Sequence, residues 1–175
     1  VLAHYAHAPR LRVLAERTGA SEAAVAGALF ESGLEREADL GRIDTDGVLA
    51  TLAERLGTAV TLEDCLAARA AAMQANEAVL GLAAAAGRHA TLAILTNNGL
   101  MLRDHFETIC PPLAPLFGGR VFCSAQFGLA KPEPEVFLRC LDLLGVAAGD
   151  ALFFDDKPDN AKGARRAGLR AHTYR

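Results

Sequence analysis

Apolar positions in the first 75 residues recur every three or four places with polar residues between them, as expected for helices that bury one face. Capping residues such as Ser21 and Thr61 begin two of these segments, and glycines end most of them. The expected helices cover 9–18, 21–33, 46–56 and 61–73. Short consecutive helices of this kind predict a small helical bundle.

The pattern changes after residue 76, where short runs of apolar, β-branched and aromatic residues alternate with helical segments. The expected strands are 91–96, 121–124, 151–154 and 172–174. The expected helices are 77–86, 100–107, 134–144 and 161–167, and the proline-rich stretch 110–115 is expected to be irregular. This alternation predicts an α/β core with a Rossmann-like parallel sheet, in which ligands gather beyond the carboxyl ends of the strands.

Composition and charge narrow the class of protein. The 175 residues suffice for one sizeable core, or for a core with a smaller insertion, and 51% hydrophobic with 22% charged residues indicates a globular chain. The net charge of -3 and the scattered basic residues do not indicate a basic surface that would bind nucleic acid. No apolar run approaches the roughly 20 residues of a membrane span, and the first ten residues do not resemble a signal peptide. The 4 cysteines form no CxxC pair, which favours reduced thiols in a cytoplasmic protein.

One candidate site lies at the end of the apolar run 151–154, where Asp155 and Asp156 come next in the chain. Two adjacent carboxylates at the carboxyl end of a buried strand repel each other, and a divalent cation such as Mg²⁺ relieves that repulsion. Residues 158–160 are expected to form the turn and the N-cap of the next helix. The same letters also suit a solvated acidic loop that only caps this helix, so both interpretations stay open.

Two further strand ends carry residues that suit an anion. Thr96 and Asn97 end the first strand of this half, and Lys131 lies in the loop before residue 134. Hydroxyl, amide and backbone N–H groups at a strand-to-helix turn suit phosphate oxygens, and a lysine supplies a point charge for a phosphoryl group. Taken singly, Thr96 and Asn97 could be an ordinary turn, and Lys131 a surface charge. Their occurrence on successive strand ends favours a shared phosphate and metal site.

Three stretches, Leu92–Asn97, Gly128–Phe137 and Phe153–Ala164, resemble motifs II, III and IV of the haloacid dehalogenase-like hydrolases. They most resemble the branch that includes small sugar-phosphate phosphatases and the N-terminal phosphatase domain of soluble epoxide hydrolase. The close resemblance covers residues 92–174. It implies a helical cap inserted just after motif I of the family. The implied domains are a remnant of the core at 1–8, a helical cap at 9–75 and the α/β core at 76–175.

The resemblance also implies an activity and a role for the anion-binding residues. Thr96 and Asn97 would hold the phosphoryl oxygens, and Lys131 would neutralise the nucleophile and the transferring group. In this family an aspartate attacks phosphorus, water hydrolyses the resulting aspartyl-phosphate, and a second aspartate handles protons. The implied protein is a Mg²⁺-dependent phosphatase of a small phosphorylated metabolite, with Thr96 and Lys131 as catalytic candidates.

The resemblance implies that Asp156 is the main Mg²⁺ ligand, with Asp155 beside it as a further ligand or as a partner behind it. Asn160 would orient the loop that carries them. A dehalogenase that acts on 2-haloacids uses the same nucleophile without a metal, and the paired carboxylates favour the metal-dependent chemistry. A catalytically inactive relative that serves as a binding or dimerisation module is the third interpretation.

Motif I of the family is an apolar strand that ends in Asp-x-Asp-Gly-x-Leu, and the stretch Asp44–Leu49 imitates these letters. Residues 35–43 carry five charges, so they cannot form a buried central strand. We expect instead a turn in which Asp44 or Thr45 caps the next helix. Val1–His4 resembles the residues that come after the glycine of motif I. We therefore expect the motif I strand to lie outside this chain, and the 175 residues alone to be inactive.

Four side chains in or near the expected cap are candidates to face a substrate: His4, Tyr5, Phe30 and Arg36. His4 and Tyr5 come first, because they lie nearest in sequence to the expected position of motif I. An ordinary packing role suits each of them equally well. No residue pattern indicates an oligomeric state.

Overall fold

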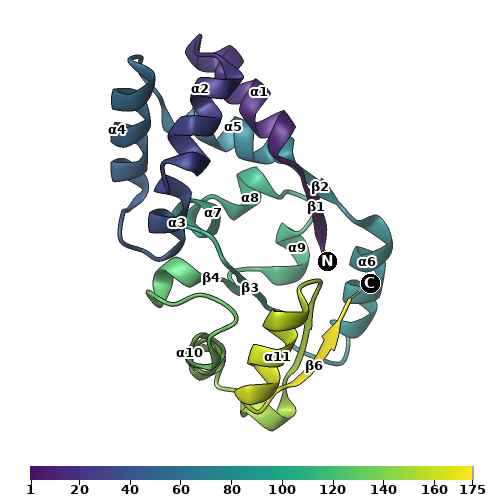
Figure 1. Ribbon diagram of the computed structural model, residues 1–175. Coiled ribbons are helices and arrows are strands. Elements are labelled where there is room, and N and C mark those ends of the chain that lie inside the picture. The colour runs from purple at the N-terminus through teal and green to yellow at the C-terminus, as the bar shows by residue number, and fades with distance from the viewer. Residues whose placement is uncertain (175) are drawn as a thin grey trace.

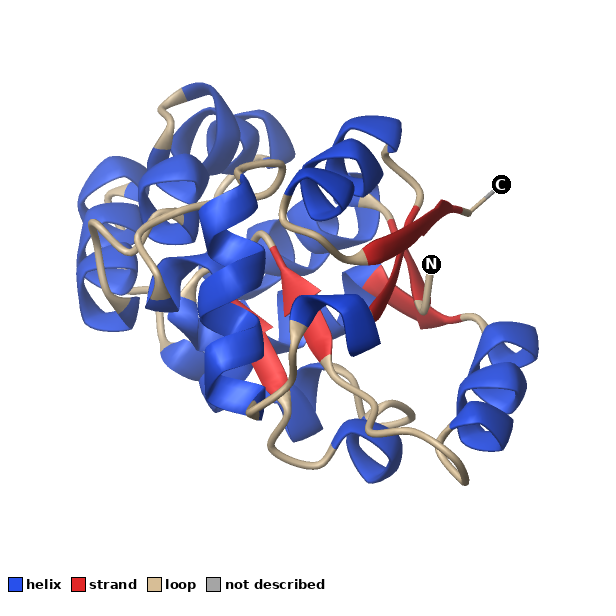
Figure 2. Cartoon of the chain, turned by 90° about the horizontal axis from the view of Figure 1, so that it is seen from below, coloured by secondary structure: helices blue, strands red, loops and turns tan. Residues whose placement is uncertain are grey.

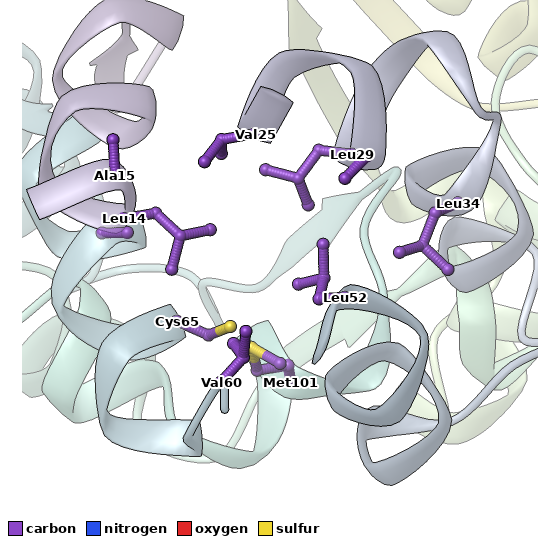
Figure 3. Packing of buried hydrophobic residues seen from close by; sticks show 11 residues of the cluster. Leu14, Ala15, Val25, Leu29, Leu34, Leu52, Val60, Cys65 and Met101 are labelled. Carbon is purple, nitrogen blue, oxygen red and sulfur yellow. The ribbon is translucent and has the colours of Figure 1, made fainter. Parts of the chain in front are cut away.

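The computed structural model describes residues 1–174, and the helices of its first part lie together in the upper part of Figure 1. They share one apolar core. These helices are α1 (His7–Thr18), α2 (Glu22–Ala26), α3 (Leu34–Asp39), α4 (Thr45–Leu56) and α5 (Leu62–Ala72), with a π-helical segment, η1 (Gly27–Glu31), after α2. Leu14, Val25, Leu29 and Leu52 are almost fully buried in this core, and Met101 reaches it from the second part of the chain (Figure 3). The predicted helical bundle is confirmed.

Capping residues set the bounds of these helices. The Ser21 hydroxyl accepts a hydrogen bond from the Ala24 N–H, and Thr61 and Asp64 form a reciprocal capping box at the start of α5. Gly19 ends α1 with a φ of 73°, which glycine adopts without steric cost. The predicted α1, α4 and α5 are confirmed, whereas the helix predicted after Ser21 divides into α2 and η1.

Helix α3 and a pair of short strands lie outside the sequence prediction. Helix α3 is short and mostly charged, and only Leu34 and Ala38 in it are buried, so no periodic pattern marks it. The antiparallel pair of β1 (Ala3–Tyr5) and β2 (Met73–Ala75) consists of strands of 3 residues each, too short to show alternation. This pair brings the start of the chain beside the end of α5.

Two pairs of short parallel strands lie in the α/β part of the molecule, and one of them reaches the edge of the molecule beside the C-terminus (Figure 2). β3 (Ile94–Thr96) pairs with β4 (Val121–Cys123), and β5 (Leu152–Asp155) pairs with β6 (Arg170–Thr173). Within the described residues, β3 and β5 belong to separate two-stranded sheets. The α/β class and the parallel direction of the strands are confirmed, although β3 begins at Ile94 rather than at the predicted residue 91.

The helices of the second part differ from prediction in three places. They are α6 (Glu77–Ala86), α7 (Leu100–Asp104), α8 (Phe106–Ile109), α9 (Ala114–Phe117), α10 (Pro134–Leu144) and α11 (Pro158–Arg166), with 3-10 turns η2 (Ser124–Gln126) and η3 (Ala148–Asp150). His105 leaves helical geometry, with φ -125° and ψ 31°, and so separates α7 from α8. The stretch 110–115, predicted to be irregular, contains the start of α9. Residues 158–160, predicted as a turn and cap, form the first turn of α11, because proline fits the first helical position.

Two further apolar clusters hold the strands in place. Phe117 and Cys123 belong to the cluster around β3 and β4, and Phe137 belongs to the cluster between α10, α11 and β5. The ring of Phe137 meets the ring of Phe153 edge-on, with their centroids 5.1 Å apart. All 4 cysteines are free and buried, as predicted for reduced thiols. The clusters fix the positions of the strand ends that carry the predicted site.

Candidate active site

A buried ion pair joins two of the predicted site residues. Lys131, in the loop between η2 and α10, donates from Nζ to Oδ2 of Asp155 at the end of β5 over 2.7 Å. The two side chains are 10% and 8% exposed, so water screens their charges little. The same ammonium group lies 5.3 Å from the centroid of the Phe153 ring. The structure thus holds one cation at a defined place beyond the end of β5.

Asp155 uses both of its carboxylate oxygens inside the protein. Oδ1 accepts a hydrogen bond from the Lys157 N–H over 2.9 Å, and Oδ2 accepts one from Asn160 Nδ2 over 3.0 Å in addition to that from Lys131. Burial by itself raises the pKa of Asp155, but the Lys131 charge and these donors outweigh burial, and the pKa lies below its usual value. Asp155 is therefore an ionised anchor for Lys131 and for the first turn of α11.

Asn97 connects the end of β3 to the loop that carries the lysine. Its Nδ2 donates to the Lys131 carbonyl oxygen and its Oδ1 accepts from the Lys131 N–H, both over 2.9 Å. These two bonds satisfy both ends of the side-chain amide. The side chain predicted to hold phosphoryl oxygens is thus engaged in positioning the backbone of Lys131.

Thr96 ends β3 and is half-buried. Its Oγ1 accepts a hydrogen bond from Asn98 Nδ2 over 2.7 Å, so the hydroxyl still has its own proton to donate. The Asn98 N–H in turn donates to the Ser124 hydroxyl over 3.0 Å, and Ser124 is fully buried. The turn after β3 is therefore held from both its backbone and its side chains.

Asp156 differs sharply from its neighbour Asp155. Asp155 is the last residue of β5 and turns inward, whereas Asp156 lies in the bend after the strand and its side chain is 65% exposed. Its Oδ1 lies 3.9 Å from the ammonium group of Val1. Among residues 1–174, no group of three or more His, Cys, Asp or Glu side chains is placed to hold a metal ion. The donor set for a cation is therefore the exposed carboxylate of Asp156, because the oxygens of Asp155 are already bonded.

The predicted site residues thus form one cluster with two neighbours. The hydrogen-bonded cluster is Asn97, Lys131, Asp155 and Asn160. Thr96 adjoins it through the chain at Asn97, and Asp156 adjoins it through Asp155 on the solvent side. The roles implied by the family resemblance for these residues stay predictions, while their proximity is a property of the fold.

The Asp-Thr-Asp-Gly stretch that imitates motif I lies elsewhere. Asp44 is the N-cap of α4, and its Oδ1 accepts a hydrogen bond from the Gly47 N–H over 2.8 Å. The side chain is exposed and belongs to no strand. The prediction that this stretch caps a helix is confirmed.

The four candidate substrate-facing side chains have different surroundings. The Tyr5 hydroxyl accepts a hydrogen bond from Arg10 Nη1 over 3.0 Å, and the ring is 43% exposed. Phe30 packs on the helical core and lies under the Arg10 guanidinium, 5.6 Å from ring centroid to Cζ. His4 and Arg36 are exposed. Packing therefore accounts for Phe30, and substrate contact by the other three stays a prediction.

The sequence does not predict the contacts that Asn98 and Arg69 make beside the predicted site residues. Local patterns give Asn98 only a turn role, although a second amide directly after Thr96-Asn97 is a usable signal. Arg69 reaches Asn98 from 29 positions away, and no local pattern reports such a contact.

Among the described helices, none combines the length and apolar character required to cross a membrane.

A family model described as "Hydrolase: haloacid dehalogenase-like hydrolase" matches residues 5–168. The chain is 38% identical to a phosphatase of Mycobacterium tuberculosis over 81 residues, and 38% identical to phosphoserine phosphatase of Thermus thermophilus over 96 residues. These matches cover 46% and 54% of this chain, but 37% and 38% of the two relatives. The chain thus matches well under two thirds of the length of each relative.

Solved structures with the same fold cover the whole chain. An enzyme of the haloacid dehalogenase (HAD) family from Bacteroides thetaiotaomicron superposes with a TM-score of 0.78 at 19% identity, over 100% of this chain and 89% of that one. Another structure of that enzyme is a complex with magnesium and inorganic phosphate, and it superposes with a TM-score of 0.75. A predicted HAD-like hydrolase from Porphyromonas gingivalis has a TM-score of 0.76 at 22% identity, over 99% of this chain and 85% of that one. At such identities the likeness shows the fold alone.

Proposed function

The chain belongs to the haloacid dehalogenase-like hydrolases, and from that premise we propose that it is a Mg²⁺-dependent phosphatase of a small phosphorylated metabolite. The observation that carries this proposal is the buried Lys131–Asp155 pair, joined through Asn97 to the turn after β3. A fixed cation at the ends of parallel strands suits a transferring phosphoryl group, which spreads negative charge over its outer oxygens. Two relatives of the chain are phosphatases, which supports the same class of reaction.

In this proposal Lys131 stabilises the charge on the phosphoryl group. The Nζ of Lys131 carries three protons. One of them forms the hydrogen bond to Asp155, and the other two are available for hydrogen bonds to phosphoryl oxygens. Because Asp155 and the Phe153 ring already hold the ammonium group, it does not reorganise when charge develops. The Thr96 hydroxyl supplies another donor, since its oxygen already accepts a hydrogen bond from Asn98.

The residues present fit a magnesium ion held mainly by Asp156. Mg²⁺ in proteins keeps several of its waters, and one or two carboxylates together with substrate phosphate oxygens often complete its shell. An exposed carboxylate beside a phosphoryl site is therefore a sufficient protein anchor, and Asp155 supports it from behind. Bound there, Mg²⁺ would neutralise charge on the phosphoryl oxygens. The related enzyme crystallised with magnesium and inorganic phosphate is consistent with this choice.

The covalent chemistry that the family resemblance implies breaks the bond between phosphorus and the alcohol oxygen of the substrate. An aspartate carboxylate attacks phosphorus, and the alcohol leaves with a proton from a second aspartate. Water then cleaves the aspartyl-phosphate and releases inorganic phosphate. We assign none of the described carboxylates to the attack, and we propose that residues 9–75 cap the core 76–175 so that bulk water is excluded.

A phosphatase panel with and without Mg²⁺ tests the proposal. The assay uses both the 175-residue chain and the protein expressed from its natural start codon, with Asp156→Asn as the test variant and Asp44→Asn as its matched control. Asp156→Asn should lose Mg²⁺-dependent phosphate release, whereas Asp44→Asn keeps a good helix cap and should leave it unchanged. Halide release from 2-haloacids without metal would favour a dehalogenase instead. Absence of any turnover in both forms would favour a binding module.

A further inference from the structure

We propose that Arg69 is a positioning residue of the phosphoryl site, and that it acts by fixing the Thr96 hydroxyl as a hydrogen-bond donor. This inference rests on the proposed phosphatase function. It concerns a residue of α5, in the helical part of the chain, which contacts none of the predicted site residues directly. The chain of contacts runs from Arg69 through Asn98 to Thr96.

Arg69 is buried and held in one place by a fixed charge. It is 6% exposed, and its Nη2 donates to Glu35 Oε1 over 3.0 Å. Glu35 also accepts two bonds of 2.8 Å from Arg10. Burial alone would raise the pKa of Glu35, but the charges of Arg69 and Arg10 and their hydrogen bonds lower it to about 2. Glu35 therefore stays ionised at neutral pH and keeps Arg69 aimed at the turn after β3.

Arg69 determines which way the Asn98 amide faces. Its Nη1 lies 3.2 Å from Asn98 Oδ1, and a guanidinium group can only donate, so the amide oxygen must face it. The Nδ2 group of Asn98 then faces Thr96 and donates to its Oγ1 over 2.7 Å. The Asn98 backbone is held as well, because its N–H donates to the buried hydroxyl of Ser124.

The orientation of this amide sets the polarity of the Thr96 hydroxyl. With Nδ2 facing it, Thr96 Oγ1 accepts from inside the protein, and its proton is left for an oxygen of a bound anion. With the amide reversed, Asn98 Oδ1 would draw that proton inward, and the hydroxyl would present lone pairs to the anion. One buried arginine thus decides whether this hydroxyl attracts or repels a phosphoryl oxygen.

Arg69 makes a contact that pairing with Glu35 does not require, because its Nη1 donates to Asn98 Oδ1. Arg10 already pairs with both oxygens of Glu35, so a second buried arginine adds desolvation cost without being needed to compensate that carboxylate. The other charged group of the cluster, Asp39, has a pKa raised to about 7, chiefly by burial and by the charge of Glu35. Among residues 1–174, the buried side-chain atoms without a hydrogen-bond partner are Asp39 Oδ1 and Arg69 Nε. The charge of Arg69 also acts on Asp39, and the hydrogen bond to Asn98 is its directional contact with the turn after β3.

The test is a double-mutant cycle on the binding of inorganic phosphate in the presence of Mg²⁺, measured by isothermal titration calorimetry on the full chain. Arg69→Met should weaken phosphate binding about tenfold, which is the loss of one oriented donor. In a Thr96→Val background, which lacks the hydroxyl, Arg69→Met should change the affinity little further. Equal losses in both backgrounds would overturn the inference, because they would show a purely electrostatic or structural effect of Arg69.

Control variants separate this inference from the proposed function. Arg10→Met removes the same charge from the same cluster without touching Asn98, so it should weaken phosphate binding much less than Arg69→Met. If Arg69→Met does not fold, Asn98→Leu interrupts the same chain of contacts and replaces it in the cycle. Should the parent chain bind phosphate and Lys131→Met weaken that binding while the cycle is additive, this inference alone fails. Absence of Mg²⁺-dependent phosphate binding in both forms used for the phosphatase panel would overturn the proposed function and the inference together.

A second measurement reports on Asn98 without any ligand. The side-chain NH₂ signals of Asn98 in a ¹H–¹⁵N spectrum should shift and lose protection from exchange in Arg69→Met, and keep their positions in Arg10→Met. Unchanged Asn98 signals in a folded Arg69→Met variant would contradict the proposed orientation.

Discussion

Replacing Lys131 by Met should destabilise the fold strongly at neutral pH, because it leaves Asp155 buried without its cation. The Asp155 side chain is 8% exposed, and removal of one partner of a buried ion pair typically costs about 3–5 kcal/mol. The Lys157 N–H and Asn160 Nδ2 still donate to the carboxylate, so the loss should lie near the lower limit, about 3 kcal/mol. For a chain of this size such a loss corresponds to a decrease in Tm of roughly 6–12 °C.

The loss should depend on pH with a definite sign. Since the folded protein lowers the pKa of Asp155, its ionisation contributes stability that is present above the unfolded pKa and is lost as pH falls through the folded pKa. In Lys131→Met the buried carboxyl has no cation, so its pKa rises and it takes up a proton readily. The difference in unfolding free energy between parent and variant should therefore shrink as the pH is lowered from 7 to below about 4.

Urea unfolding monitored by far-ultraviolet circular dichroism measures these free energies of unfolding. Asp155→Asn, alone and combined with Lys131→Met, completes a double-mutant cycle for the ion pair. The double variant carries neither charge, so it should be more stable than Lys131→Met alone by about 1–2 kcal/mol at pH 7. If Lys131→Met loses the same free energy at both pH values, or if the two substitutions are additive, then the buried pair does not stabilise the fold in the way the geometry indicates.

Three further outcomes are expected. In Gly163→Ala the added methyl group would overlap the carbonyl oxygen of Pro132. The free energy of unfolding should therefore fall by about 1–3 kcal/mol, seen as a lower Tm, and phosphate affinity should fall as well. The control Gly81→Ala has open space around the new methyl group and should not destabilise the fold. Because folding raises the pKa of Asp39 to about 7, the free energy of unfolding should decline by about 4 kcal/mol between about pH 4 and pH 8 in urea unfolding, and Asp39→Asn should remove that decline. Asp44→Ala removes a helix cap and should cost about 1 kcal/mol without changing phosphate affinity in calorimetry.

Local chemistry made much of the secondary structure predictable. The hydroxyls of Ser21 and Thr61 cap helices through bonds to residues three positions away, and Gly19 ends α1 because its φ of 73° suits glycine. The parallel strands were predictable for the same reason, since short apolar runs alternate with amphipathic helices. The candidate residues were predictable as a set, because the carboxyl ends of parallel strands carry ligand-binding groups in such folds.

Longer contacts along the chain were not predictable from local patterns. Arg69 meets Asn98 from 29 positions away and Glu35 from 34, and nothing near Arg69 in the sequence reports either partner. The division of labour between the two acids also depends on the fold. Asp155 turns inward to Lys131, and Asp156 turns to solvent, although both residues are aspartates.

The sequence by itself determined which residue types stand at the strand ends and where most helices begin and end, because hydrogen bonds over three or four positions and the periodicity of apolar residues are written locally. The tertiary structure alone decided which of those groups already have partners inside the protein. It directs the Asn97 amide to the backbone of Lys131 and leaves most of the Asp156 side chain exposed. The physical reason is that a side chain's partner, burial and ionisation depend on segments that only folding brings together.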